Sequence, residues 1–104
     1  MATATLANKE VEVTEEGFLV NPDDWTEDIA KEIAKQEGIE LTDRHWDVIR
    51  FMREDYKKNG TSATIRHITK HSDITTKELY QLFPKGPAKL AAKIAGVPKP
   101  VGCI

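Results

Sequence analysis

Apolar and polar residues alternate one by one near the start of the chain. Val11 and Val13 alternate with glutamates, and this period of two indicates a β-strand. Gly17 suits a turn, after which residues 18–20 can return as a second strand, so we expect a β-hairpin. A lone hairpin is only marginally stable, and it must therefore pack on helices. Residues 1–8 are small and polar, and we expect them to be disordered.

From about residue 25 onward, apolar residues recur three and four positions apart, which is the spacing of one helical face. Thr42, Ser62 and Thr75 are expected N-caps, because their hydroxyl groups can bind the free N–H groups of a first turn. Glu78 follows Thr75 as in a capping box. Gly96 is expected to end the last helix. The five expected helices span residues 25–37, 43–58, 63–70, 76–83 and 87–95.

Length and composition place these elements in one small domain. The chain has 104 residues, of which 39% are hydrophobic and 31% charged, as in a soluble globular protein with one modest core. It shows no signal peptide and no apolar run long enough to span a bilayer. The predicted fold class is mainly α (α+β). We expect a small helical domain over residues 9–96 with an N-terminal β-hairpin, a helix–turn–helix at 63–83, and a flexible C-terminal arm at 97–104.

Acidic and basic residues are distributed unevenly along the chain. Residues 1–56 contain 15 acidic and 6 basic residues, whereas residues 57–104 contain 2 acidic and 9 basic residues. Such asymmetry indicates a polar molecule with a basic working face. The alternative is that the two halves fold against each other and partly neutralise one another, and the sequence leaves both open.

Cys103 is the only cysteine, and it lies next to the last residue of the chain. Pro98 and Pro100 favour an extended backbone ahead of it, because proline lacks an N–H donor and disfavours helix in the preceding residue. Residues 97–104, fully extended, would span roughly 26 Å. A thiol on such an arm can be passed between the pockets of different proteins, whereas the alternative is a tail cysteine without a role. One cysteine cannot form an internal disulfide, which favours a reducing cytoplasm.

Basic residues in the same half of the chain are candidates to support this thiol. Lys99 lies four residues before Cys103, and Lys85 and Lys89 precede it. Their charge would stabilise a thiolate or an anionic persulfide, since thiol reactivity depends on exposure and on nearby positive charge. Arg66 lies where an apolar and a polar helix face meet, and its guanidinium can bind a carboxylate or a sulfur oxyanion. A simple surface arginine is the alternative.

Two further patterns have simpler explanations. His67 and His71 lie four residues apart, as two metal ligands on a helix would, but no third and fourth ligand accompany them. We therefore expect no metal and no cofactor. The segment 63–83 has helix–turn–helix character, yet its second helix offers few side chains that read bases. We prefer two packed helices and do not expect direct binding to nucleic acid, and a DNA-binding regulator stays an alternative function.

A close resemblance to the DsrC/TusE family of sulfur-carrier proteins lies in the C-terminal run LYQLFPKGPAKLAAKIAGVPKPVGCI. Two earlier segments, EEGFLVNPDDW and LTDRHWDVIRFMRE, are similar to the same family in the same order. The resemblance covers residues 9–104 and implies helices around a helix–turn–helix, an N-terminal hairpin and a mobile arm. It also implies that the penultimate cysteine, here Cys103, carries sulfur as a persulfide between a donor protein and an acceptor protein docked through the arm.

One position departs from part of this family. Members that work with dissimilatory sulfite reductase have a second cysteine at the position that Ala92 occupies here. The resemblance therefore implies a single-cysteine, TusE-like carrier that relays sulfur toward 2-thiouridine in tRNA or in sulfur oxidation, rather than a stand-alone catalyst. A sulfite-reductase-associated gamma subunit is the alternative, and the sequence leaves open whether Ala92 is native or engineered. The resemblance further implies that Arg66 holds the arm or an anionic sulfur species.

Overall fold

The computed structural model of the protein describes residues 2–100, and Met1 and residues 101–104 lie outside the described part. Two antiparallel strands come first, and a short 3-10 helix (η1) and the α-helices follow. In chain order the elements are β1 (Ala2–Leu6), β2 (Lys9–Val13), η1 (Pro22–Asp24), α1 (Glu27–Gln36), α2 (Asp43–Asn59), α3 (Ile65–His71), α4 (Thr76–Leu82) and α5 (Pro87–Ala95).

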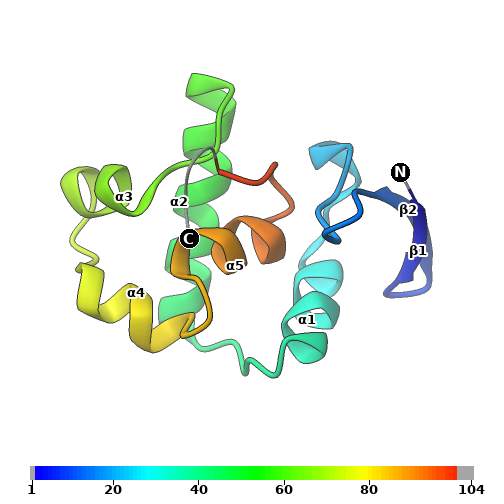
Figure 1. Cartoon of the computed structure of the whole chain (residues 1–104), viewed down its shortest axis with the longest axis horizontal. Coiled ribbons are helices and arrows are strands. Elements are labelled where there is room, and N and C mark those ends of the chain that lie inside the picture. Colours follow the sequence, from blue (N-terminus) through cyan, green and yellow to red (C-terminus); the bar gives the residue numbers. More distant parts are fainter. Residues whose placement is uncertain (1, 101–104) are drawn as a thin grey trace.

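Helix α5 lies at the centre of the molecule and packs against both α2 and α1 (Figure 1). Its residues Ala88, Ala91 and Ala95 are fully buried, and these small side chains let the neighbouring helices approach closely. Helices α3 and α4 form one side of the molecule, and α1 and the hairpin form the other (Figure 1). The largest fully buried side chains of the core are those of Phe18, Phe83, Leu19, Ile29, Ile33, Ile49, Met52, Ile68, Leu79 and Ile94.

The predicted class, mainly helical with an N-terminal hairpin, is confirmed. Thr42 and Thr75 are the N-caps of α2 and α4, and Gly96 ends α5 with a left-handed φ of 71°. The prediction that Ser62 caps the third helix is wrong. Thr64 takes that place and its hydroxyl accepts an N–H of the first turn, so α3 begins two residues later than expected. Within residues 2–100, no helix is both long and apolar enough to cross a membrane.

The hairpin uses a first strand that differs from the predicted one. Residues 2–6, which the sequence predicts as disordered, form β1 and pair with β2. Ala7 and Asn8 join the strands with positive φ angles of 51° and 65°, as in the turns that match the natural twist of a hairpin. Leu6 is buried, so the apolar positions of β1 anchor it to the domain. Pairing with β2 and burial of Leu6 therefore make residues 2–6 a strand, and the prediction that they are disordered is wrong.

The predicted return strand at residues 18–20 is present only as a single bridge between Val13 and Leu19. The turn falls where expected, because the N–H of Gly17 donates to the carbonyl of Thr14 at 2.9 Å. Phe18 and Leu19 are buried in the core, so this segment packs on the helices and does not extend the sheet.

Residues 97–100, which the sequence predicts as the start of a mobile arm, are packed against the domain. Val97 is 1% exposed, and Pro100 is also buried. The Ser62 hydroxyl donates a hydrogen bond to the carbonyl of Pro98, and this contact also explains why Ser62 does not cap α3. The remaining arm residues lie outside the described part of the chain.

Candidate functional site at the root of the C-terminal arm

The arm begins where α5 ends, and its root (Gly96–Lys99) is held in one position. Gly96 takes the left-handed conformation that ends the helix, and the N–H of Val97 donates back to the carbonyl of Ala92 at 3.1 Å. The indole ring of Trp25 lies directly against Gly96. A Cβ atom at Gly96 would lie only 2.4 Å from Cδ1 of Trp25, so only glycine fits at this turn.

Trp25 and Arg53 bind the last carbonyl groups of α5, which have no partner within the helix. Nε1 of Trp25 donates to the carbonyl of Ile94 at 2.8 Å, and Nη1 of Arg53 donates to that of Ala95 at 2.8 Å. The Arg53 guanidinium also lies 4.2 Å from the centre of the Trp25 ring, a cation–π contact. Burial lowers the pKa of Arg53, with nearby Asp23 opposing the shift, and arginine remains charged at neutral pH. The two side chains therefore fix the direction in which the arm leaves α5.

Glu16 links the arm root to the outer face of α5. Its carboxylate accepts a hydrogen bond from Nζ of Lys99 at 3.0 Å, and its second oxygen lies 3.4 Å from Nζ of Lys89. The hydrogen bond from Lys99 is the largest cause that lowers the pKa of the Glu16 carboxyl below its ordinary value, and Lys89 adds to the effect. The ion pairs are therefore retained above the ordinary pKa of glutamate and are lost as the pH falls through the lowered value.

The arm root runs between two hollows of the surface. The larger hollow, of about 570 Å³, is bounded by the segment 14–20 together with Pro98 and Lys99. The smaller hollow, of about 310 Å³, is bounded by the loop 60–64 together with the same two arm residues. Phe18, Leu19 and Val20 give the larger hollow an apolar wall. Each side of the root thus offers a concave surface to a docked molecule.

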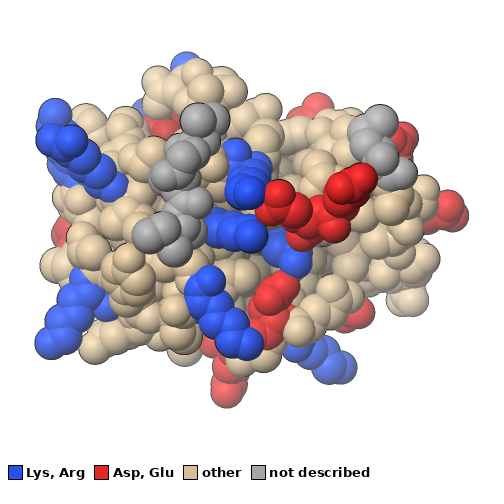
Figure 2. All heavy atoms as spheres, in the orientation of Figure 1, with Lys and Arg blue, Asp and Glu red and all other residues tan. Residues whose placement is uncertain are grey.

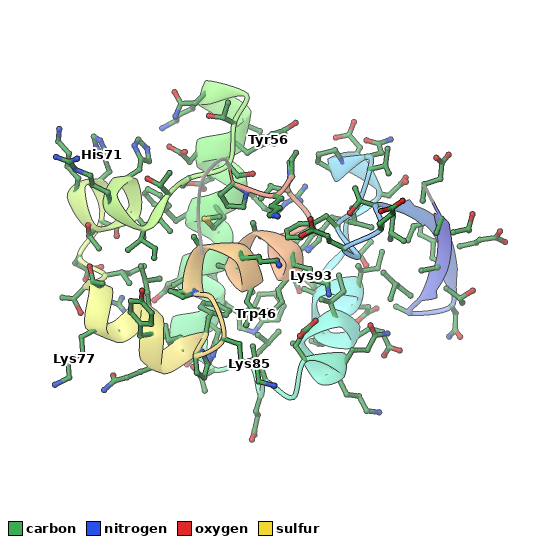
Figure 3. The ribbon with its side chains drawn as sticks, in the orientation of Figure 1. Trp46, Tyr56, His71, Lys77, Lys85 and Lys93 are labelled. Carbon is green, nitrogen blue, oxygen red and sulfur yellow. The ribbon has the colours of Figure 1, made fainter. Side chains whose placement is uncertain are left out.

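The structure brings some predicted site residues together and separates others. Lys89 and Lys99 meet at Glu16, whereas Lys85 is exposed at the outer edge of the molecule (Figure 3). Arg66 is exposed on α3, away from this ion-pair group, and it lines a different hollow. Cys103 lies outside the described residues, so its predicted role stays a prediction.

Position 92 lies inside the domain and not on its surface. Ala92 is fully buried on α5, one turn before the arm begins. The next residue, Lys93, reaches Glu37 with 2.7 Å between Nζ and Oε1, and its stem lies against Gly17. The side chain at this position is therefore a buried methyl group. The resemblance implies that two-cysteine members of the family have a thiol at the same position.

Four residues that contact the arm root or the end of α5 have no functional role in the sequence prediction: Glu16, Trp25, Arg53 and Ser62. Trp25 is predicted to lie in a helix face, yet it precedes α1, for which Thr26 is the N-cap. The only local signal for the site is Gly96, which marks a helix end whose carbonyl groups need donors. The donors come from segments far away in the sequence, and no spacing rule identifies them.

Comparison with known proteins agrees with this geometry. The family model described as DsrC like protein matches residues 5–104. Sulfurtransferase TusE of Photorhabdus laumondii is 49% identical over 111 residues, and the match covers 100% of both chains. The gamma subunit of the dissimilatory-type sulfite reductase of Nitratidesulfovibrio vulgaris is 42% identical over 105 residues, again with 100% of both chains covered. The chain belongs to the DsrC-like family, which confirms the resemblance seen in its C-terminal run.

Solved structures support the same conclusion about the fold. The solution structure of DsrC from Allochromatium vinosum is 42% identical with a TM-score of 0.85, and the match covers 98% of this chain and 97% of that one. The crystal structure of the oxidized gamma subunit of dissimilatory sulfite reductase (DsrC) from Archaeoglobus fulgidus is 36% identical with a TM-score of 0.81. The match covers 99% of this chain and 100% of that one. The helical domain with its N-terminal hairpin is thus the fold of this family.

Proposed function

We propose that the protein is a sulfur carrier that accepts a persulfide sulfur on Cys103 and relays it to a partner protein. The proposal is supported mainly by the family to which the chain belongs. The two relatives described above are named as a sulfurtransferase and as a subunit of a sulfite reductase. The chain has one cysteine, at the position next to the C-terminus. A reducing compartment such as the cytoplasm would keep this thiol free to react.

The proposed transfer is a thiolate exchange. The Cys103 thiolate attacks the outer sulfur of the donor's persulfide, a new sulfur–sulfur bond forms on Cys103, and the donor's bond breaks. The electron pair of the broken bond leaves with the donor as its thiolate. The same exchange toward an acceptor thiolate discharges the carrier, so the cycle needs no external oxidant or reductant.

The packed arm root limits how the carrier can reach its partners. Because residues 97–100 contact the domain, only residues 101–104 lie beyond the described root, and fully extended they span roughly 13 Å. The reach is thus about half of what the whole arm would have. A partner must approach the root closely, or its binding must release the contacts of Lys99 and Pro98. Release of Glu16 would also free the charges of Lys89 and Lys99 to stabilise an anionic persulfide.

A sulfite-reductase-associated gamma subunit is the second candidate, and the 42% identity with such a subunit favours keeping it. A chain with one cysteine cannot hold sulfur bridged between two of its own thiols, which favours the simple carrier. Co-purification with sulfite reductase subunits from the source organism would support the second candidate. The relatives found give no support to the DNA-binding alternative.

We expect Glu16→Gln to increase the rate of Cys103 alkylation modestly, because ion pairs between exposed side chains are weak. The substitution removes the carboxylate that holds Lys99 and Lys89, so the arm root loosens and both charges become available to the thiolate. Intact mass spectrometry during iodoacetamide treatment measures the rate. Glu15→Gln is the matched control, because Glu15 is exposed and adjacent. Equal rates in both variants would contradict a restraining role of Glu16.

A further inference from the structure

Opposite charges gather at opposite ends of the molecule. Residues 1–40, which include the hairpin and α1, contain 11 acidic and 3 basic residues. Residues 57–85, which include α3 and α4, contain 6 basic and 2 acidic residues. Figure 2 shows lysine and arginine at the edge formed by α3 and α4, while acidic residues gather toward the hairpin side. The halves therefore do not fully neutralise each other, and a basic surface remains.

The centre of this surface is a hollow on α3, called here the α3 hollow. It has a volume of about 290 Å³ and is lined by Thr64, Arg66, His67, Lys70 and His71. Arg66 and Lys70 are exposed, and neither forms an ion pair with any other residue among 2–100.

Several other cations of the protein form ion pairs within it. Lys9 pairs with Asp24, Lys93 pairs with Glu37, and Arg44 lies 2.7 Å from Glu78. Such pairs leave little net charge for an external partner. Lys31, Lys35, Lys57, Lys58, Lys77 and Lys85 also form no ion pair among residues 2–100, so Arg66 and Lys70 are distinguished by lining the same hollow.

The two histidines give the hollow a fixed wall. Nε2 of His67 lies 2.7 Å from Oδ1 of Asp55 on α2, which orients the ring. The His71 ring packs on it with 4.4 Å between centroids, and the Phe51 ring lies 6.2 Å from His67 on another side. Figure 3 shows His71 at the outer edge of the molecule. The wall is thus a pre-organised element, while the charged groups of Arg66 and Lys70 extend into solvent.

We propose that the α3 hollow is a docking surface for an acidic segment of the protein that exchanges sulfur with this carrier. The inference rests on the proposed function, because it names the chemistry of the partner. Complementary charge steers association and fixes orientation. Because the protein as a whole has a net charge of −2, its basic surface attracts a short acidic patch of a partner, whereas the rest of the molecule does not.

Two observations favour an acidic protein segment over nucleic acid. Binding of single strands relies on exposed aromatic faces for base stacking, whereas the only aromatic rings that line the α3 hollow are those of His67 and His71, which pack on each other. A long polyanion would also extend across the molecule, whose largest dimension is 35 Å, and would meet the acidic end. A short acidic segment avoids this repulsion because it contacts only the basic end.

The α3 hollow lies next to the arm root. Thr64 lines both the α3 hollow and the smaller hollow that Pro98 and Lys99 border. The loop 60–64 also supplies Ser62, whose hydroxyl holds the carbonyl of Pro98. A partner seated on α3 is therefore positioned beside the segment that carries the thiol, within the short reach that the packed root allows.

The test uses the full chain and a fluorescein-labelled decaglutamate peptide, with anisotropy measured at low salt. We expect Arg66→Glu/Lys70→Glu to weaken binding at least about tenfold, which corresponds to about 1.4 kcal/mol. Lys31→Glu/Lys35→Glu is the matched control, because it makes the same charge change at the same spacing on exposed positions of α1. We expect this control to weaken binding less than about twofold. Equal weakening in both variants, or no binding to the wild type, would overturn the proposal.

Two further measurements separate the possible failures. Tighter binding of a decauridylate RNA than of decaglutamate would overturn the assignment to a protein partner. Sulfur loading of the wild type by polysulfide needs no docking surface, so its absence would refute the carrier function and not the basic docking surface. We expect that only Arg66→Glu/Lys70→Glu loses binding of the peptide, and that the wild type is loaded with sulfur by polysulfide.

Discussion

Replacement of Cys103 with serine is expected to abolish sulfur loading completely. A serine hydroxyl is not ionised at neutral pH and cannot form a persulfide, and the chain has no second cysteine to take over. The measurement is intact mass after incubation with polysulfide or a loaded donor protein. The wild type should gain the mass of one or more sulfur atoms, and a reductant should remove them.

The unfolding free energy of Cys103→Ser is measured beside that of the wild type as a control. Equal values show that a loss of loading comes from the missing thiol and not from a loss of folding. A variant that still gains reductant-sensitive sulfur, or a wild type that never gains any, would refute the carrier proposal.

Gly96→Ala is expected to lower the free energy of unfolding by about 2–4 kcal/mol, the sum of backbone strain and overpacking. The φ angle of 71° disfavours any residue with a Cβ atom, and that atom would lie 2.4 Å from the Trp25 ring. The ring cannot move away easily, because it donates to Ile94 and carries the Arg53 guanidinium on its face. The alanine must therefore displace either Trp25 or the arm root.

Gly60→Ala provides the matched control for this measurement. Gly60 also ends a helix with a φ angle of 71°, but no atom lies within 4 Å of the position that its Cβ would take. We expect it to cost only the conformational strain, about 1 kcal/mol. Urea denaturation of both variants gives the difference directly. Equal losses would mean that the contact between Trp25 and Gly96 does not fix the arm root.

The helices and their ends could be predicted because they depend on local chemistry. The Thr75 hydroxyl accepts the N–H of Glu78, and the N–H of Thr42 donates to the ring of His45, so each cap is formed within three residues. Gly96 has a conformation that few other residues tolerate. Ser62 was equally suitable as a cap by this rule. Its hydroxyl instead binds Pro98, 36 residues away, and no local rule reveals that competition.

The site also has features that the local sequence predicts and features that depend on contacts between distant segments. The predictions of a thiol carrier at Cys103 and of an extended segment around Pro98 and Pro100 follow from residue types alone, because the properties of cysteine and proline that they use do not depend on the fold. The pairing of Lys89 and Lys99 at Glu16 was not predictable, since it joins three segments distant in the sequence. Arg66 lines the α3 hollow, and its predicted role of holding the arm or an anionic sulfur species stays a prediction.

The helical class, most of the helix ends, the position of the single cysteine and the family can be inferred from the linear sequence, since these depend on spacing, side-chain type and motif. The presence of β1, the packing of the arm root and the set of cations without an ion pair became visible only in the folded domain. Those features arise when distant segments meet, and the free energy of such contacts depends on distances and burial that a linear pattern does not contain.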